Sequence, residues 1–94
     1  DRLIFVSTSD TCRSPMAEVI ANAVFKNNGM DACAFSRGIF AESGMPASEY
    51  AKLAVKNYGL SLEEHRACQL TESDIKEADL IVTERKRTYQ TRLE

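Results

Sequence analysis

The fold is decided by the stretch Leu3-Ile4-Phe5-Val6-Ser7-Thr8-Ser9-Asp10-Thr11-Cys12-Arg13-Ser14-Pro15-Met16. Its first four residues are a continuous apolar run, which is typical of a strand buried on both faces of a parallel sheet. A polar loop follows, and Ser14-Pro15 then predicts a helix that begins with an N-cap residue and a proline. The sequence therefore predicts a strand, a loop and a helix in immediate succession.

The same alternation continues along the chain. Apolar residues at helical spacing run from Met16 to Val24 and end near Gly29, and residues 32–37 read as a second strand. Pro46 is predicted to open a second helix, and Gly59 to close it. The residues expected to point inward from this helix are Ala47, Tyr50, Ala51, Leu53, Ala54 and Tyr58.

The last third of the chain contains a short helix, a strand and a polar segment. Thr71 and Asp74 resemble a capping box, residues 79–83 read as a third buried strand, and residues 84–94 are polar and helix-prone. We therefore predict one α/β domain over residues 1–94, with a parallel sheet of about three strands and helices on both faces.

Composition narrows the possible functions. The 94 residues carry a net charge of −2 and no apolar run of membrane-spanning length, so we expect neither nucleic-acid nor membrane binding. The first residues are too short for a secretory leader, and we expect a cytoplasmic protein. Three cysteines suggest neither a disulfide framework nor a metal site, and Cys33 and Cys68 are predicted to be buried.

Ligands of a parallel sheet bind at the carboxyl ends of its strands, where the loop 7–14 lies. Backbone N–H groups, the positive end of a helix dipole and Arg13 could together hold a tetrahedral dianion there. The loop lacks the glycine and lysine spacing of a nucleotide P-loop. An ordinary strand-to-helix turn, in which serine, threonine and aspartate only cap backbone groups, is the alternative.

Residues 5–18 resemble the phosphate loop of the low-molecular-weight protein tyrosine phosphatase family. Further matches lie at Ser36, Gly38, Pro46-Ala47, His65, Leu70-Thr71 and Ala78-Asp79-Leu80. The resemblance implies that a cysteine at the position of Ser7 attacks phosphorus and forms a cysteinyl-phosphate. It also implies that Arg13 and the amides of the loop hold the phosphate oxygens, with no metal or cofactor. The loop residues concerned are Ser7, Thr8, Ser9, Asp10, Thr11, Cys12, Arg13 and Ser14.

The sequence departs from this family at two loop positions. Ser7 replaces the nucleophilic cysteine, which removes most of the attack chemistry, and both a natural and an engineered origin are open. Asp10 replaces an asparagine, and the resemblance implies that this residue bonds to Ser14, Ser36 and His65. The alternative for His65 is an ordinary surface residue.

The resemblance covers only the N-terminal part of the family, so the family's leaving-group acid has no counterpart here. The third strand would then be an open edge, from which we expect self-association. Thr11 and Phe40 resemble the arginine-phosphatase branch and are candidate specificity residues. The alternatives are that Thr11 only caps the loop and that Phe40 only packs on the core.

We therefore expect a phosphoprotein phosphatase domain for phosphotyrosine or phosphoarginine, inactive or weak because of Ser7 and the missing acid. Its partners would be a phosphorylated protein and a phosphate or sulfate ion in the loop. The alternative is a non-catalytic module that binds phosphate or a phosphorylated residue. An arsenate reductase-like protein is a remote alternative, because only Cys68 lies where such enzymes need a cysteine pair.

Overall fold

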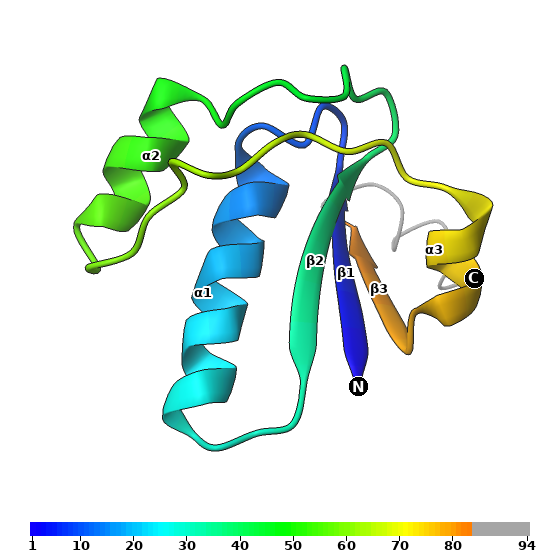
Figure 1. The fold of residues 1–94 in the computed structure, drawn as a ribbon, viewed down its shortest axis with the longest axis horizontal. Coiled ribbons are helices and arrows are strands. Elements are labelled where there is room, and N and C mark those ends of the chain that lie inside the picture. The colour runs from blue at the N-terminus through cyan, green and yellow to red at the C-terminus, as the bar shows by residue number, and fades with distance from the viewer. Residues whose placement is uncertain (84–94) are drawn as a thin grey trace, which may run out of the picture.

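The computed structural model describes residues 1–83. They form, in chain order, β1 (Arg2–Ser7), α1 (Arg13–Asn27), β2 (Cys33–Gly38), α2 (Glu49–Lys56), α3 (Glu72–Glu77) and β3 (Leu80–Thr83) (Figure 1). The helix predicted over residues 84–94 lies outside this part. None of the described helices has the length and apolar character needed to span a bilayer.

The three strands form a parallel sheet in the order β2-β1-β3. β1 pairs with β2 along its whole length and with the shorter β3 over four residues. Ile4 and Val6, on one face of β1, are buried, whereas Leu3 and Phe5 on the other face are only partly buried, so the predicted burial on both faces is met in full on one face only. The α/β fold with a parallel sheet is confirmed.

Helices cover both faces of this sheet. Consecutive residues of a strand point to opposite faces, and two residues of β2 show which helix lies on each. Ser36 bonds to Glu18 of α1, whereas Arg37 pairs with Asp74 of α3. In Figure 1, α1 and α2 accordingly lie on one side of the sheet and α3 on the other.

The beginning of α1 differs from the prediction. The helix begins at Arg13, with Cys12 as an N-cap residue whose side chain makes no capping bond. Ser14 lies inside the first turn, where its hydroxyl donates to Asp10 instead of capping the helix. The Ser-Pro signal thus placed the helix correctly to within two residues, but the predicted capping role of Ser14 is wrong.

The beginning and the buried face of α2 also differ. Ser48, not Pro46, precedes the helix, and its hydroxyl accepts the Ala51 amide. Ala51 and Val55 are buried, as is the preceding Ala47. The predicted inward positions Tyr50, Leu53 and Tyr58 are 69%, 62% and 75% exposed. This short helix packs against α1 through a narrow stripe, so its larger side chains remain outside.

Two predictions of burial are wrong. β3 is an edge strand in the described part of the chain, and Leu80 at its start is 54% exposed. Cys33 and Cys68 are exposed rather than buried, because Cys33 begins an outer strand and Cys68 lies in a connecting segment. The capping box of Thr71 and Asp74 at α3 is confirmed.

Candidate functional site

A five-residue loop connects the carboxyl end of the central strand to the N-terminus of α1. Its backbone carbonyls are held from outside the loop. The amides of Ile39 and Phe40 donate to the carbonyls of Ser7 and Thr8 at 3.0 and 2.8 Å. The Ser48 amide donates to the Thr11 carbonyl at 2.8 Å. These bonds fix the loop with its carbonyls facing the surrounding segments.

Most backbone N–H groups of the loop make no hydrogen bond to the protein among residues 1–83. The Asp10 amide donates to the Ser7 hydroxyl at 3.3 Å. Among residues 1–83, the amides of Thr8, Ser9, Thr11 and Cys12 have no protein acceptor. Such N–H groups at a helix N-terminus form a favourable site for an anion. Arg13 begins the helix with an exposed side chain and adds a full positive charge to this end.

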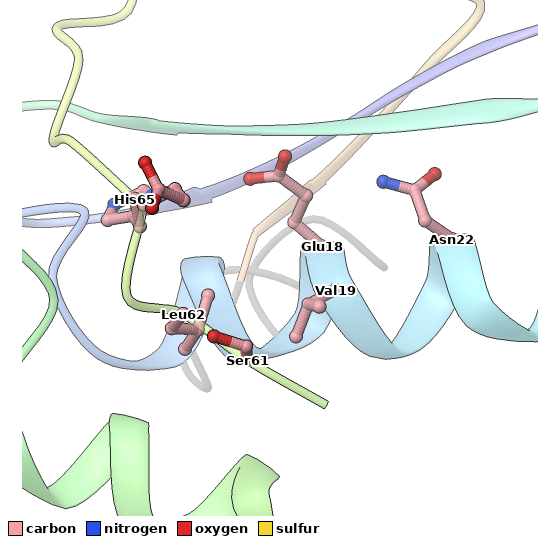
Figure 2. A pocket seen from close by; sticks show the side chains of 7 residues that line it. Glu18, Val19, Asn22, Ser61, Leu62 and His65 are labelled. Atoms are coloured by element: carbon pink, nitrogen blue, oxygen red, sulfur yellow. The ribbon is translucent and has the colours of Figure 1, made fainter. Parts of the chain in front are cut away.

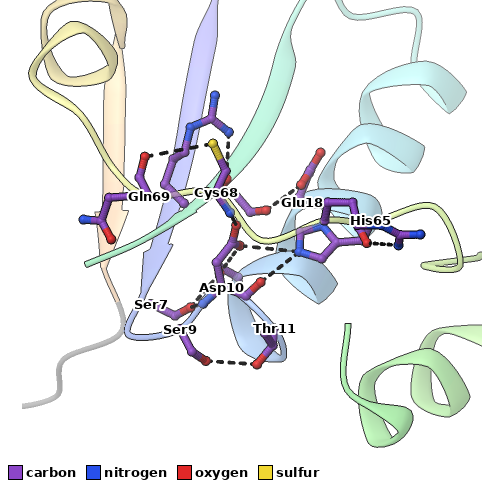
Figure 3. Close-up of polar contacts among 12 residues, drawn as sticks. Ser7, Ser9, Asp10, Thr11, Glu18, His65, Cys68 and Gln69 are labelled. Carbon is purple, nitrogen blue, oxygen red and sulfur yellow. Dashed lines mark hydrogen bonds and ion pairs between the residues drawn. The ribbon is translucent and has the colours of Figure 1, made fainter. Parts of the chain in front are cut away.

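Asp10 is the buried support of the loop. It is fully buried and its φ is +59°, a left-handed conformation that aspartate tolerates. One carboxylate oxygen accepts the Ser14 hydroxyl at 2.8 Å, and the other accepts the Cys68 amide at 2.9 Å. His65 Nε2 lies 2.8 Å from the Asp10 carbonyl and 3.9 Å from its carboxylate (Figure 3).

The predicted partners of Asp10 are thus met in part. Ser14 and His65 contact it, and His65 is not the ordinary surface residue of the alternative interpretation. The predicted bond to Ser36 is wrong, because the Ser36 hydroxyl donates to Glu18 at 2.7 Å. Glu18 lies on the side of α1 that faces β2, and this places its carboxylate closer to Ser36.

Two supporting residues were not identified from the sequence. Gln69 accepts the Ala41 amide at 2.8 Å and donates to the Ile39 carbonyl at 2.7 Å, which holds the segment beside the loop. Glu18 is the second. Burial raises the pKa of Glu18 above its ordinary value, although the Ser36 hydroxyl, His65 and Arg37 act in the opposite direction. The only sequence signal for Glu18 was its place at the end of the stretch 5–18 that resembles the family's phosphate loop.

Glu18 and His65 also border a cavity of about 260 Å³ behind the loop. Figure 2 shows it between α1, which carries Glu18, Val19 and Asn22, and the segment that carries Ser61 and Leu62. The cavity therefore lies next to the buried support of the loop, since His65 contacts Asp10.

Of the two candidate specificity residues, Thr11 lies in the loop and Phe40 lies beside it in the chain segment that follows β2. The Thr11 hydroxyl is 2.9 Å from that of Ser9 at the loop surface. Phe40 is 81% exposed, although its amide is bonded to the loop. The alternative that Phe40 packs on the core is therefore wrong for the described residues.

Comparison with known proteins identifies this arrangement. Residues 2–93 match the family model described as "Low molecular weight phosphotyrosine protein phosphatase". The chain is 42% identical over 82 residues to the low molecular weight protein-tyrosine-phosphatase PtpB of Staphylococcus aureus. That alignment covers 87% of this chain and 55% of PtpB, so the chain spans about half the length of the curated relatives it matches.

Solved structures agree with the sequence comparison. A low molecular weight protein tyrosine phosphatase from T. tengcongensis is 49% identical, with a TM-score of 0.84 over 87% of this chain and 56% of that one. A Cys-to-Ser mutant of the arginine phosphatase YwlE, with a phosphorylated active-site serine, is 33% identical. Its TM-score is 0.89 over 96% of this chain and 59% of that one. The chain belongs to the low-molecular-weight phosphotyrosine protein phosphatase family.

Proposed function

We propose that the loop 7–14 binds the phosphate group of a phosphorylated protein residue, and that the chain is a phosphoprotein phosphatase domain with weak turnover of its own. The observation that carries this proposal is the orientation of the loop. Three of its carbonyls accept amides of surrounding segments, whereas most of its N–H groups have no protein acceptor among residues 1–83 and the Asp10 amide donates to the Ser7 hydroxyl at the start of the helix. Positive charge from Arg13 and the helix dipole would stabilise the transferred phosphoryl group.

Weak turnover follows from the chemistry of Ser7. A thiolate at this position needs no base, because a helix N-terminus and an arginine lower the pKa of a thiol. A hydroxyl stays protonated until it attacks, and the phosphate ester that it forms is stable to water. The YwlE mutant with serine at its active site carries a phosphorylated serine, which supports Ser7 as a phosphoryl acceptor.

The substrate class that we propose is phosphotyrosine or phosphoarginine in a protein. Relatives named for both activities lie at similar identity, 42% and 35%. Thr11 and Phe40 favour the arginine branch by resemblance. At the position of Thr11, phosphotyrosine-preferring members of the family usually carry isoleucine or another bulky apolar residue, and threonine is smaller and offers a hydroxyl to a polar group. Free cysteines and a net charge of −2 support our proposal of a cytoplasmic protein without nucleic-acid or membrane partners.

A non-catalytic phosphate-binding module is the second candidate, and Ser7 is the observation that favours it. Such a module would keep the loop, the buried Asp10 and Arg13, and would lack only the attacking thiolate. A thiol at position 7 should restore turnover in a phosphatase domain, but not in a module that only binds phosphate. Position 7 is therefore the position to test.

The test compares the parent chain with Ser7→Cys, using 4-nitrophenyl phosphate, whose leaving group departs without protonation. We expect both chains to bind vanadate, measured by calorimetry, and only Ser7→Cys to turn over repeatedly. Arg13→Ala should weaken vanadate binding at least about tenfold, since a charged hydrogen bond contributes roughly 1.5–3 kcal/mol. Exposed Arg66→Ala is the matched control and should bind normally.

Binding without turnover by Ser7→Cys would favour the non-catalytic module. Failure of both chains to bind vanadate would overturn both candidates and leave an ordinary strand-to-helix turn.

A further inference from the structure

A chain of hydrogen bonds leads from the Ser7 hydroxyl to a buried carboxylate. Ser7 Oγ lies 2.6 Å from Ser14 Oγ, and Ser14 donates to Asp10 Oδ1 at 2.8 Å. A hydroxyl has a single proton to donate. Because Ser14 uses its proton on Asp10, Ser7 must be the donor to Ser14. The proton of Ser7 therefore already points along a path that ends at Asp10.

The surroundings of Asp10 suit an acceptor of this proton. Its other oxygen accepts the Cys68 amide, so both oxygens are used as acceptors, as in an ionised carboxylate. His65 Nε2 lies 3.9 Å from the carboxylate and would form an ion pair with it when the ring is protonated. The Asp10 amide meanwhile donates to Ser7 Oγ, where it would stabilise the negative charge that develops as the proton leaves.

We propose that Asp10 acts through Ser14 as the proton acceptor that makes Ser7 a nucleophile, an inference that rests on the proposed function. In this step a bond forms between Ser7 Oγ and phosphorus as the bond from phosphorus to the leaving oxygen breaks. The leaving oxygen keeps the electron pair of the broken bond. The Ser7 proton moves to Ser14 Oγ, and the Ser14 proton moves to Asp10 Oδ1.

The proposal gives one explanation for both departures of this loop from the family pattern. An asparagine can accept the Ser14 hydrogen bond but cannot take up its proton. A thiolate nucleophile needs no such acceptor, whereas a serine does. In a chain with cysteine at position 7, Asp10 would only position the loop. In the parent chain, which has serine there, Asp10 would also accept a proton, and this difference can be measured.

The experiment is a double-mutant cycle of Asp10→Asn in the parent chain and in Ser7→Cys. Each chain is mixed with 4-nitrophenyl phosphate, and the initial burst of 4-nitrophenolate is timed while mass spectrometry detects the phosphoryl group on residue 7. In the parent chain, we expect Asp10→Asn to slow phosphorylation roughly 100-fold, within the range of general base catalysis. In Ser7→Cys, the same substitution should slow the burst far less, since no proton is removed there and only the support of the loop changes.

A pH profile separates proton acceptance from support of the loop. The ratio of the parent's rate to that of Asp10→Asn should depend on pH, because only the parent has a proton acceptor at position 10. Glu18 on α1 and His65 on the facing segment also act on Asp10, and Arg13 lies three residues further along the chain. They are present in both chains, so the ratio isolates Asp10. In Ser7→Cys the corresponding ratio should be flat.

Three results would overturn the inference. Equal slowing by Asp10→Asn in both backgrounds would mean that Asp10 only holds the loop. If Ser7→Cys is active but the parent chain is never phosphorylated, or is phosphorylated at a rate that does not depend on Asp10, the proton transfer to Asp10 is wrong. The proposed function would stand in that case. Absence of any burst and of vanadate binding in both backgrounds would overturn the proposed function together with the relay.

Discussion

At the scale of single residues, a substitution of Thr11 shows which phosphorylated side chain the loop prefers as substrate. Its hydroxyl lies at the loop surface, beside that of Ser9. In Ser7→Cys, we expect the further change Thr11→Ile to lower kcat/KM for a phosphoarginine peptide relative to a phosphotyrosine peptide. The shift should be roughly tenfold or more, because a changed methyl or hydroxyl group in a pocket alters discrimination by about 1–3 kcal/mol.

Thr11→Ser is the matched control for this prediction, because it keeps the hydroxyl and should retain the preference. Relative kcat/KM values for the two peptides, measured in one competition assay, provide the readout. An unchanged ratio in Thr11→Ile would assign Thr11 to capping of the loop alone.

Glu18 gives a pH dependence of stability. Burial raises the pKa of its carboxyl group in the folded chain, so the folded state favours the protonated form. The stability that this group contributes is fully present below its ordinary pKa and is lost as pH rises through the raised value. We expect Glu18→Gln to stabilise the chain at neutral pH, because the amide keeps an acceptor for Ser36 without a buried charge.

The stabilisation by Glu18→Gln should disappear in acid, where Glu18 is itself protonated. Thermal unfolding at neutral and acid pH provides the measurement, and exposed Glu42→Gln is the control, for which we expect no change. A variant that is less stable at neutral pH would show that the charge of Glu18 is itself used in the fold.

At the scale of elements, the end of β2 and the loop are in direct contact at Gly38. A Cβ atom at this position would lie 2.8 Å from the Thr8 carbonyl oxygen and 2.9 Å from Ala41 Cβ. Neither atom is the end of a flexible side chain, so the loop or the strand would have to move. We expect Gly38→Ala to destabilise the chain by about 1–3 kcal/mol and to weaken vanadate binding.

The control for Gly38 is Gly44→Ala, since Gly44 has open space around it but a φ of +93°. This variant should lose stability of about 1 kcal/mol through backbone strain and keep its vanadate affinity. Chemical denaturation and calorimetry on both variants provide the comparison. Normal vanadate binding by Gly38→Ala would mean that the loop tolerates displacement by this strand.

Elements with strong local signals could be predicted from the sequence. The apolar run of β1, the loop and the periodic pattern of α1 identified the fold, and the spacing of Thr71 and Asp74 identified α3. The start of α1 was misplaced because the Ser14 hydroxyl is used by Asp10, a contact within the loop that a propensity pattern does not register. The bonds of Asp10 to the Cys68 amide and of Ser36 to Glu18 depend on tertiary placement, which local spacing cannot provide.

At the scale of the whole molecule, the two outer strands of the sheet are protected differently. The backbone N–H and C=O groups of Ala34 on β2 are both bonded by the Asn22 side chain. Those of Gly38 on the same strand are bonded by Cys68 and Leu70. In the described part of the chain β3 pairs only with β1, and its first residue, Leu80, is 54% exposed.

The unequal edges predict how the 94-residue chain self-associates. An open strand edge with exposed apolar residues can pair with another chain, and a lysine on the edge opposes this. We expect association that depends on concentration in gel filtration with light scattering, and we expect Leu80→Lys to shift the chain towards a monomer. Leu53→Lys on α2 changes an equally exposed leucine away from the edge and should leave association unchanged. If the parent chain elutes as a monomer at every concentration, or if both lysine variants act alike, then pairing through β3 is wrong.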